Sequence, residues 1–102
     1  MIMNIQSIKI IVVPQSIENK EELLLFLSKE IGFPGYFGNN WDALEECLCD
    51  LHWLSEGELK IIHEPDFKLK NESDNIVYKE ILNVAIKSWQ DSNEHKLEVC
   101  FE

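Results

Sequence analysis

Residues 33–48 read FPGYFGNNWDALEECL, and this stretch decides how the rest of the sequence is interpreted. Its first half, 33–40, is rich in proline, glycine and asparagine, which favour fixed or positive φ angles, so it predicts a structured loop. Its second half begins a helix that runs from Trp41 to about Leu51, and Asn40 is placed to cap the start of that helix. The stretch therefore predicts a loop that leads directly into a helix.

The predicted helix has one apolar face and one acidic face. Helical spacing places on the apolar face Trp41, Leu44, Cys47, Leu48 and Leu51. The opposite face carries Asp42, Glu45, Glu46 and Cys49, and Asp50 follows one turn after Glu46. Like charges three or four positions apart destabilise a helix, and the helix dipole favours acids only in the first turn. The acids at Glu46 and Asp50 therefore favour a binding surface, and an ordinary solvated helix face is the alternative.

Negative charge is concentrated around this helix. The chain has 19 acidic residues, nine lysines and no arginine, a net charge of −10. The interval between Lys29 and Lys60 contains no basic residue and carries −7 of that charge. Such a surface repels nucleic acids and anionic membranes, whereas it attracts a cationic partner. Ordinary solubility is the alternative explanation for the total charge, but it explains the local concentration less well.

The sequence on either side of this stretch predicts an α/β fold. Apolar, β-branched runs predict strands at Ile5–Val13, which should be buried, at Leu59–His63 and at Lys96–Phe101. Helical spacing predicts one helix that Ser16 caps and Gly32 ends, with Glu21 and Glu22 near its first turn, and another from Ile76 to Trp89. The polar stretch 71–75 has room for a short helix of its own.

These elements follow one another in the order βααβαβ. The connections between the strands exceed a dozen residues, so they are crossovers, and they predict a three-stranded, mainly parallel sheet flanked by helices. The 102 residues suit a single domain, 1–102.

Several other classes of protein fit the sequence poorly. There is no apolar run of membrane-spanning length and no signal-peptide pattern, so we expect a cytoplasmic protein. The odd count of three cysteines predicts reduced thiols. No combination of these cysteines with His52, His63 or His95 has zinc-finger spacing, and no cofactor or metal is expected. A metal- or carboxylate-dependent enzyme is a distant alternative, because a convex helix face offers no pocket for catalysis.

The stretch 33–48 closely resembles the signature of the barstar family, which are intracellular inhibitors of secreted ribonucleases of the barnase type. It joins a Tyr-aromatic-Gly-x-Asn loop to an Asp-Ala-Leu-x-acid-Cys-Leu helix without a gap, and the close match covers about residues 31–51. The resemblance implies that loop and helix plug a ribonuclease active site, with carboxylates in the places of RNA phosphates. The implied partner is a basic ribonuclease or other nuclease-type toxin bound 1:1, with no direct contact to nucleic acid or membrane.

The resemblance also assigns roles to particular residues. Tyr36 would be the aromatic contact, Gly38 and Asn40 would supply loop contacts, and Asp42 and Glu46 would be the principal carboxylates. From their place on the acidic face, Glu45, Cys49 and Asp50 are expected as further partner-binding residues, although Cys49 and Asp50 follow where the barstar helix turns to small residues.

The sequence departs from the family pattern at further points. Glu46 stands where the family often has Asp, and Glu45 stands where an aromatic residue is common. The acid that the family supplies from a later helix has no clear counterpart, with Asp74 as the sole candidate. These departures point to a different partner from the best-known one, and a basic toxin that is not a ribonuclease is the alternative.

Overall fold

The fold was taken from a computed structural model, which describes residues 8–33, 40–50, 54, 57–90 and 95–102. A short π-helical turn, η1, follows the first helix. The elements in chain order are β1 (Ile8–Val13), α1 (Lys20–Leu27), η1 (Ser28–Gly32), α2 (Trp41–Cys49), β2 (Glu58–His63), α3 (Glu72–Trp89) and β3 (Lys96–Phe101). None of the described helices is long and apolar enough to cross a membrane.

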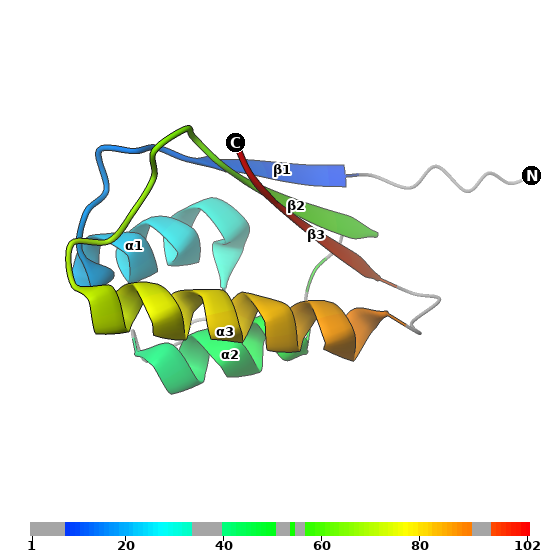
Figure 1. The fold of residues 1–102 in the computed structure, drawn as a ribbon. Helices are drawn as coiled ribbons and strands as arrows, with labels where there is room; N and C mark the ends of the chain where they lie inside the picture. Colours follow the sequence, from blue (N-terminus) through cyan, green and yellow to red (C-terminus); the bar gives the residue numbers. More distant parts are fainter. Residues whose placement is uncertain (1–7, 34–39, 51–53, 55–56, 91–94) are drawn as a thin grey trace, which may run out of the picture.

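The three strands form one parallel sheet in the order β1-β2-β3 (Figure 1). In the middle of the sheet, Ile11 pairs with Ile61, which in turn pairs with Val99. The helices cover one face of this sheet. The predicted α/β fold, with crossover helices between parallel strands, is therefore confirmed.

Strand β1 is confirmed as a strand, but the expectation that it is buried was wrong. Because the helices lie on one face, its alternate side chains point to the other face. Ile8, Ile10 and Val12 are 52%, 56% and 48% exposed, whereas Ile11 and Val13 are buried. Residues 5–7 of the predicted strand lie outside the described residues.

Helix α1 is capped by Asn19, so the expectation that Ser16 is the cap was wrong. Pro14 and Ile17 close a turn with a 3.2 Å hydrogen bond, which keeps Ser16 ahead of the helix. The Asn19 Oδ1 atom accepts the backbone N–H of Glu22 at 2.9 Å, and its Nδ2 donates to the Glu22 carboxylate, also at 2.9 Å. This reciprocal cap satisfies a donor that an uncapped helix would leave open.

The carboxyl end of this helical segment and the start of α3 also differ in detail from the prediction. The segment ends at Gly32 as expected, and glycine suits this position because its φ is +83°. Helix α3 begins at Glu72 and not at Ile76, since Asn71 caps it by accepting the N–H of Asp74 at 3.0 Å. The polar stretch 71–75 is therefore the first turn of α3 and not a separate helix.

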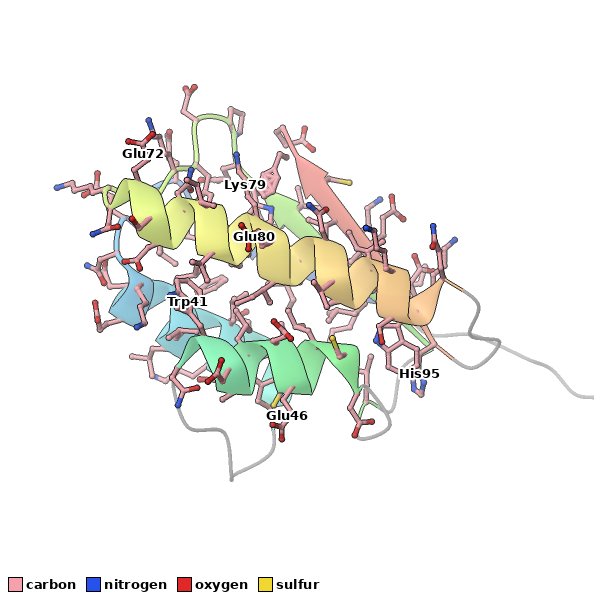
Figure 2. All side chains as sticks on the ribbon, turned by 60° about the horizontal axis from the view of Figure 1, so that its bottom comes forward. Trp41, Glu46, Glu72, Lys79, Glu80 and His95 are labelled. Carbon is pink, nitrogen blue, oxygen red and sulfur yellow. The ribbon has the colours of Figure 1, made fainter. Side chains whose placement is uncertain are left out.

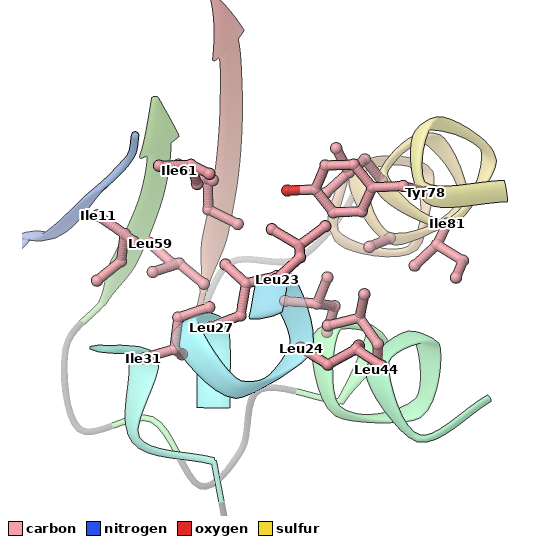
Figure 3. Close-up of a cluster of buried hydrophobic side chains, with 14 of the residues drawn as sticks. Ile11, Leu23, Leu24, Leu27, Ile31, Leu44, Leu59, Ile61, Tyr78 and Ile81 are labelled. Atoms are coloured by element: carbon pink, nitrogen blue, oxygen red, sulfur yellow. The ribbon is translucent and has the colours of Figure 1, made fainter. Parts of the chain in front are cut away.

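The core lies between the sheet and the three α-helices (Figure 3). Leu23 and Leu27 of α1, Leu44 of α2 and Ile81 of α3 meet the inward side chains of the sheet, such as Ile61. The apolar spacing within each predicted helix anticipated this core. It did not identify Tyr78, whose aromatic ring is fully buried.

Tyr78 and His63 join α3 to the central strand by a buried polar contact. The Tyr78 hydroxyl lies 2.7 Å from Nε2 of His63, whose Nδ1 lies 2.9 Å from the carbonyl oxygen of Cys100. A carbonyl can only accept, so Nδ1 carries the proton, and the hydroxyl donates to Nε2. Burial lowers the pKa of His63 and raises that of Tyr78, which favours the neutral form of both.

Candidate functional site

Helix α2 begins where the sequence predicts. Oδ1 of Asn40 accepts the backbone N–H of Ala43 at 2.7 Å, and Asn40 has the extended backbone of an N-cap residue. The predicted cap is thus confirmed, and this side-chain oxygen is engaged within the protein. The helix ends at Cys49, with Asp50 as its C-cap.

The two faces of α2 are also as predicted. Leu44, Cys47 and Leu48 are buried, and Trp41 is partly buried. Asp42, Glu45 and Glu46 are exposed, as is Asp50, while Cys49 is half-buried. Glu46 points away from the body of the molecule in Figure 2. The predicted loop contacts Tyr36 and Gly38, and the predicted core residue Leu51, lie outside the described residues.

The acidic face, which the sequence predicts to be convex, carries a shallow depression that is widely open to solvent. A depression of about 440 Å³ is lined by Asp42, Glu45, Glu46, Cys49 and Asp50. The thiol of Cys49 is less exposed than the flanking carboxylates, and it forms part of the wall. The structure therefore brings together five of the predicted binding residues, and four of them are acidic.

Helix α3 holds α2 in place from behind. The indole Nε1 of Trp89 donates to the carbonyl of Leu48 at 2.8 Å, and Oγ of Ser88 lies 3.4 Å from the carbonyl of Cys49. These two side chains donate to carbonyls in the last turn of α2, where the helix has no N–H donors of its own for them. The sequence pattern placed Trp89 on the apolar face of its helix but could not reveal its partner.

Aromatic contacts fix the other end of α2. The ring of Trp41 stacks on Tyr78 with centroids 6.2 Å apart, and Nζ of Lys20 lies 5.6 Å from the Trp41 ring. Packing of Trp41 against the protein, predicted from its place on the apolar stripe, is confirmed. Both ends of the acidic helix are therefore anchored, which limits the backbone entropy that the helix loses when a partner binds.

The electrostatics of the face favour binding of a cation and disfavour thiol chemistry. Burial, and then the nearby Glu45 carboxylate, raise the pKa of the Cys49 thiol. Burial, followed by the charges of Glu46 and Asp50, raises the pKa of Cys47. Both thiols therefore stay protonated near neutral pH, and a protonated thiol is a poor nucleophile and metal ligand.

Within the described ranges, no three His, Cys, Asp or Glu side chains are grouped so that they could hold a metal ion. The ion pairs that can be described, Lys60–Glu98 and Lys70–Glu18, join other elements. The acidic face thus carries negative charge that these lysines do not offset.

Comparison with known proteins identifies the family. No curated protein matches the sequence. The profile of the family described as Barstar (barnase inhibitor) matches residues 9–102, which include every described element except the first residue of β1. Because the match spans most of the sequence and agrees with the parallel α/β fold and the acidic second helix, this chain belongs to the barstar family of barnase inhibitors.

Proposed function

We propose that the protein is an intracellular immunity protein that inhibits a basic ribonuclease toxin by plugging its active site with the acidic face of α2. The observation that carries the proposal is the depression in which Asp42, Glu45, Glu46 and Asp50 present their carboxylates together. A ribonuclease active site is lined by cations that hold RNA phosphates. Carboxylates at successive helical turns can occupy such phosphate positions without being cleaved.

The proposal gives each residue a part. Asp42 and Glu46 lie one turn apart on the exposed face and supply the principal charges. Glu45 and Asp50 extend the charge along the helix, and Cys49 supplies the wall between them. In the preceding loop, Tyr36 adds the aromatic contact, and Gly38 and Asn40 add loop contacts.

Glu45 favours one alternative within the same class of function. Where relatives commonly offer an aromatic ring, this chain offers an exposed carboxylate, so its surface is more strongly charged and stacks less well. A partner with additional cations suits it, whether that partner is a ribonuclease or another basic toxin. Inhibition of RNA cleavage would identify the partner as a ribonuclease, and binding without such inhibition would identify it as another basic toxin.

The experiment is to purify the protein with the toxin encoded beside its gene and to follow cleavage of a fluorogenic RNA substrate. The proposal expects competitive inhibition at a 1:1 ratio, with slower association as salt rises because the attraction is electrostatic. The test variants are Asp42→Asn and Glu46→Gln, and Glu21→Gln on the exposed first turn of α1 is the matched control. Full cleavage at saturating inhibitor would contradict inhibition, whereas inhibition that both test variants retain would contradict the assigned surface.

A further inference from the structure

The seam between α3 and β3 is an open apolar groove away from the acidic face of α2, and Trp89, which lines one end of it, also bonds to Leu48 of α2. One hollow of about 290 Å³ is lined by Lys79, Leu82, Asn83, Ile86, Val99 and Phe101. A second, of about 250 Å³, shares Ile86 and continues past Trp89, Leu97 and Lys96. Because the two hollows adjoin at Ile86, we treat them as one surface and call it the α3–β3 groove.

Strand β3 borders this groove with an open backbone edge. Among the described strands, β3 pairs only with β2, so its other edge lies at the margin of the sheet. The N–H of Lys96 donates to the carbonyl of Gly57, just before β2, at 3.0 Å, and the N–H of Glu102 donates to that of His63 in β2 at 3.1 Å. Since alternate residues of a strand direct their backbone groups to opposite sides, Leu97, Val99 and Phe101 direct theirs to the open edge.

The same three residues turn their side chains toward the groove. Val99 and Phe101 line the first hollow and Leu97 lines the second. Phe101 is 44% exposed although its ring stacks on His63 at 3.9 Å. One strand edge thus offers hydrogen-bonding groups and apolar contacts side by side, the arrangement to which an added peptide strand binds.

The charge of the groove is opposite to that of the protein. The charged residues among its described lining are Lys79 and Lys96, in a chain of net charge −10. Nζ of Lys79 lies 5.3 Å from the Phe101 ring, and Figure 2 shows Lys79 on the side of α3 toward β3. A second copy of the chain is a poor occupant, because it would bring like net charges and two sets of groove lysines together.

We propose that the α3–β3 groove binds an extended acidic peptide segment, which adds to β3 as a fourth strand. Alternate apolar side chains of the segment fill the groove beside Leu82 and Ile86, and its acidic residues meet Lys79 and Lys96. This surface is separate from the acidic face of α2, so the proposal does not depend on ribonuclease inhibition. The protein would then hold an acidic partner and a basic partner at the same time.

The test uses a fluorescein-labelled peptide of sequence Asp-Val-Thr-Val-Thr-Val-Asp, with binding followed by fluorescence anisotropy. Matched peptides carry Lys at both ends, or N-methyl groups on alternate backbone nitrogens. The protein variants are Lys79→Glu, which reverses a groove charge, and Asn83→Trp, which fills the groove from an exposed helix position. Lys29→Glu makes the same charge change at an exposed residue of η1 and serves as the control.

We expect saturable binding of the acidic peptide, weaker by about three- to tenfold in Lys79→Glu, in keeping with an exposed ion pair. Asn83→Trp and N-methylation should abolish binding, and Lys29→Glu should not change it. Amide hydrogens of Val99 and Phe101 should exchange more slowly when the peptide is bound. Far-UV circular dichroism checks that each variant is folded, and ribonuclease inhibition by Lys79→Glu should equal that of the parent.

Three results would overturn the proposal. The first is the absence of saturable binding, and the second is equal binding of the acidic and lysine-ended peptides. The third is a concentration-dependent dimer, measured by sedimentation, that Asn83→Trp disrupts, since a second copy would then occupy the groove.

Discussion

Replacing Glu46 with glutamine is expected to stabilise the free protein while it weakens inhibition. Glu46 lies one turn after Asp42 and one turn before Asp50, so it forms two like-charge pairs at i,i+4 spacing. Each such pair costs a helix about 0.2–0.5 kcal/mol. The Asp42 pair lies within the helix and Asp50 is its C-cap, so the replacement should raise the free energy of unfolding by about 0.2–1 kcal/mol.

The stability half of this prediction is measured by urea unfolding at low ionic strength, followed by circular dichroism. The control is Glu21→Gln, which makes the same change in the first turn of α1. There the carboxylate is favoured by the helix dipole, so its loss should destabilise the protein by about 0.3–1 kcal/mol. The two variants lose the same charge, so an effect of net charge would change the free energy of unfolding in the same direction in both. Changes of opposite sign would show that the repulsion near Glu46 is local.

The binding half is measured as the inhibition constant against the ribonuclease. A buried charged residue at the centre of an interface commonly contributes at least about 2 kcal/mol, so inhibition should weaken by about 30-fold or more. Higher stability together with weaker inhibition would show that Glu46 serves binding and lowers the stability of the free protein. A Glu46→Gln variant that is less stable than the parent, or that inhibits equally well, would refute this reasoning.

Three further predictions concern the framework around α2. Tyr78→Phe should lower the free energy of unfolding by about 1–3 kcal/mol, because it leaves the buried Nε2 of His63 without its donor, and urea unfolding measures the loss. Burial lowers the pKa of His63 in the folded state, and the positive charge of Lys79 acts in the same direction. The unfolded chain, in which histidine has a pKa of about 6.5, therefore binds the proton first as pH falls, so the free energy of unfolding should decline below that pH. An NMR titration midpoint of 6.5 or above for the imidazole of His63 would contradict the prediction. Asn40→Ala and Asn19→Ala should each cost about 1 kcal/mol in thermal or urea unfolding because each removes an N-cap, but only Asn40→Ala should also weaken inhibition.

The parts of the fold and site that sequence predicts well depend on neighbours in the chain. The cap at Asn40 and the two faces of α2 follow from contacts three or four residues apart, so the pattern alone identifies them. Three strands and their parallel connection follow from the lengths of the runs between them. The sequence predicted the acidic face but not the depression in it, because the wall of the depression depends on how far Cys49 is buried.

The parts that sequence could not supply depend on contacts between distant elements. An apolar strand such as β1 has the same pattern whether one or both faces are covered, so its exposed residues were wrongly expected to be buried. His63 and Tyr78 form a pair across 15 residues and two elements, and nothing local marks either as the other's partner. Ser16 and Asn19 are both good cap residues, and the turn at Pro14 decided between them.

The anchoring of α2 by α3 has a consequence for the timing of synthesis. The carbonyl of Leu48 receives its hydrogen bond from Trp89, a residue 41 positions later in the chain. At a translation rate of about 5–20 residues per second, the second residue follows the first by about 2–8 seconds. During that interval the nascent chain carries the acidic sequence without the clamp that fixes the end of its helix. A newly made molecule should therefore acquire its finished acidic face only after Trp89 has been synthesised.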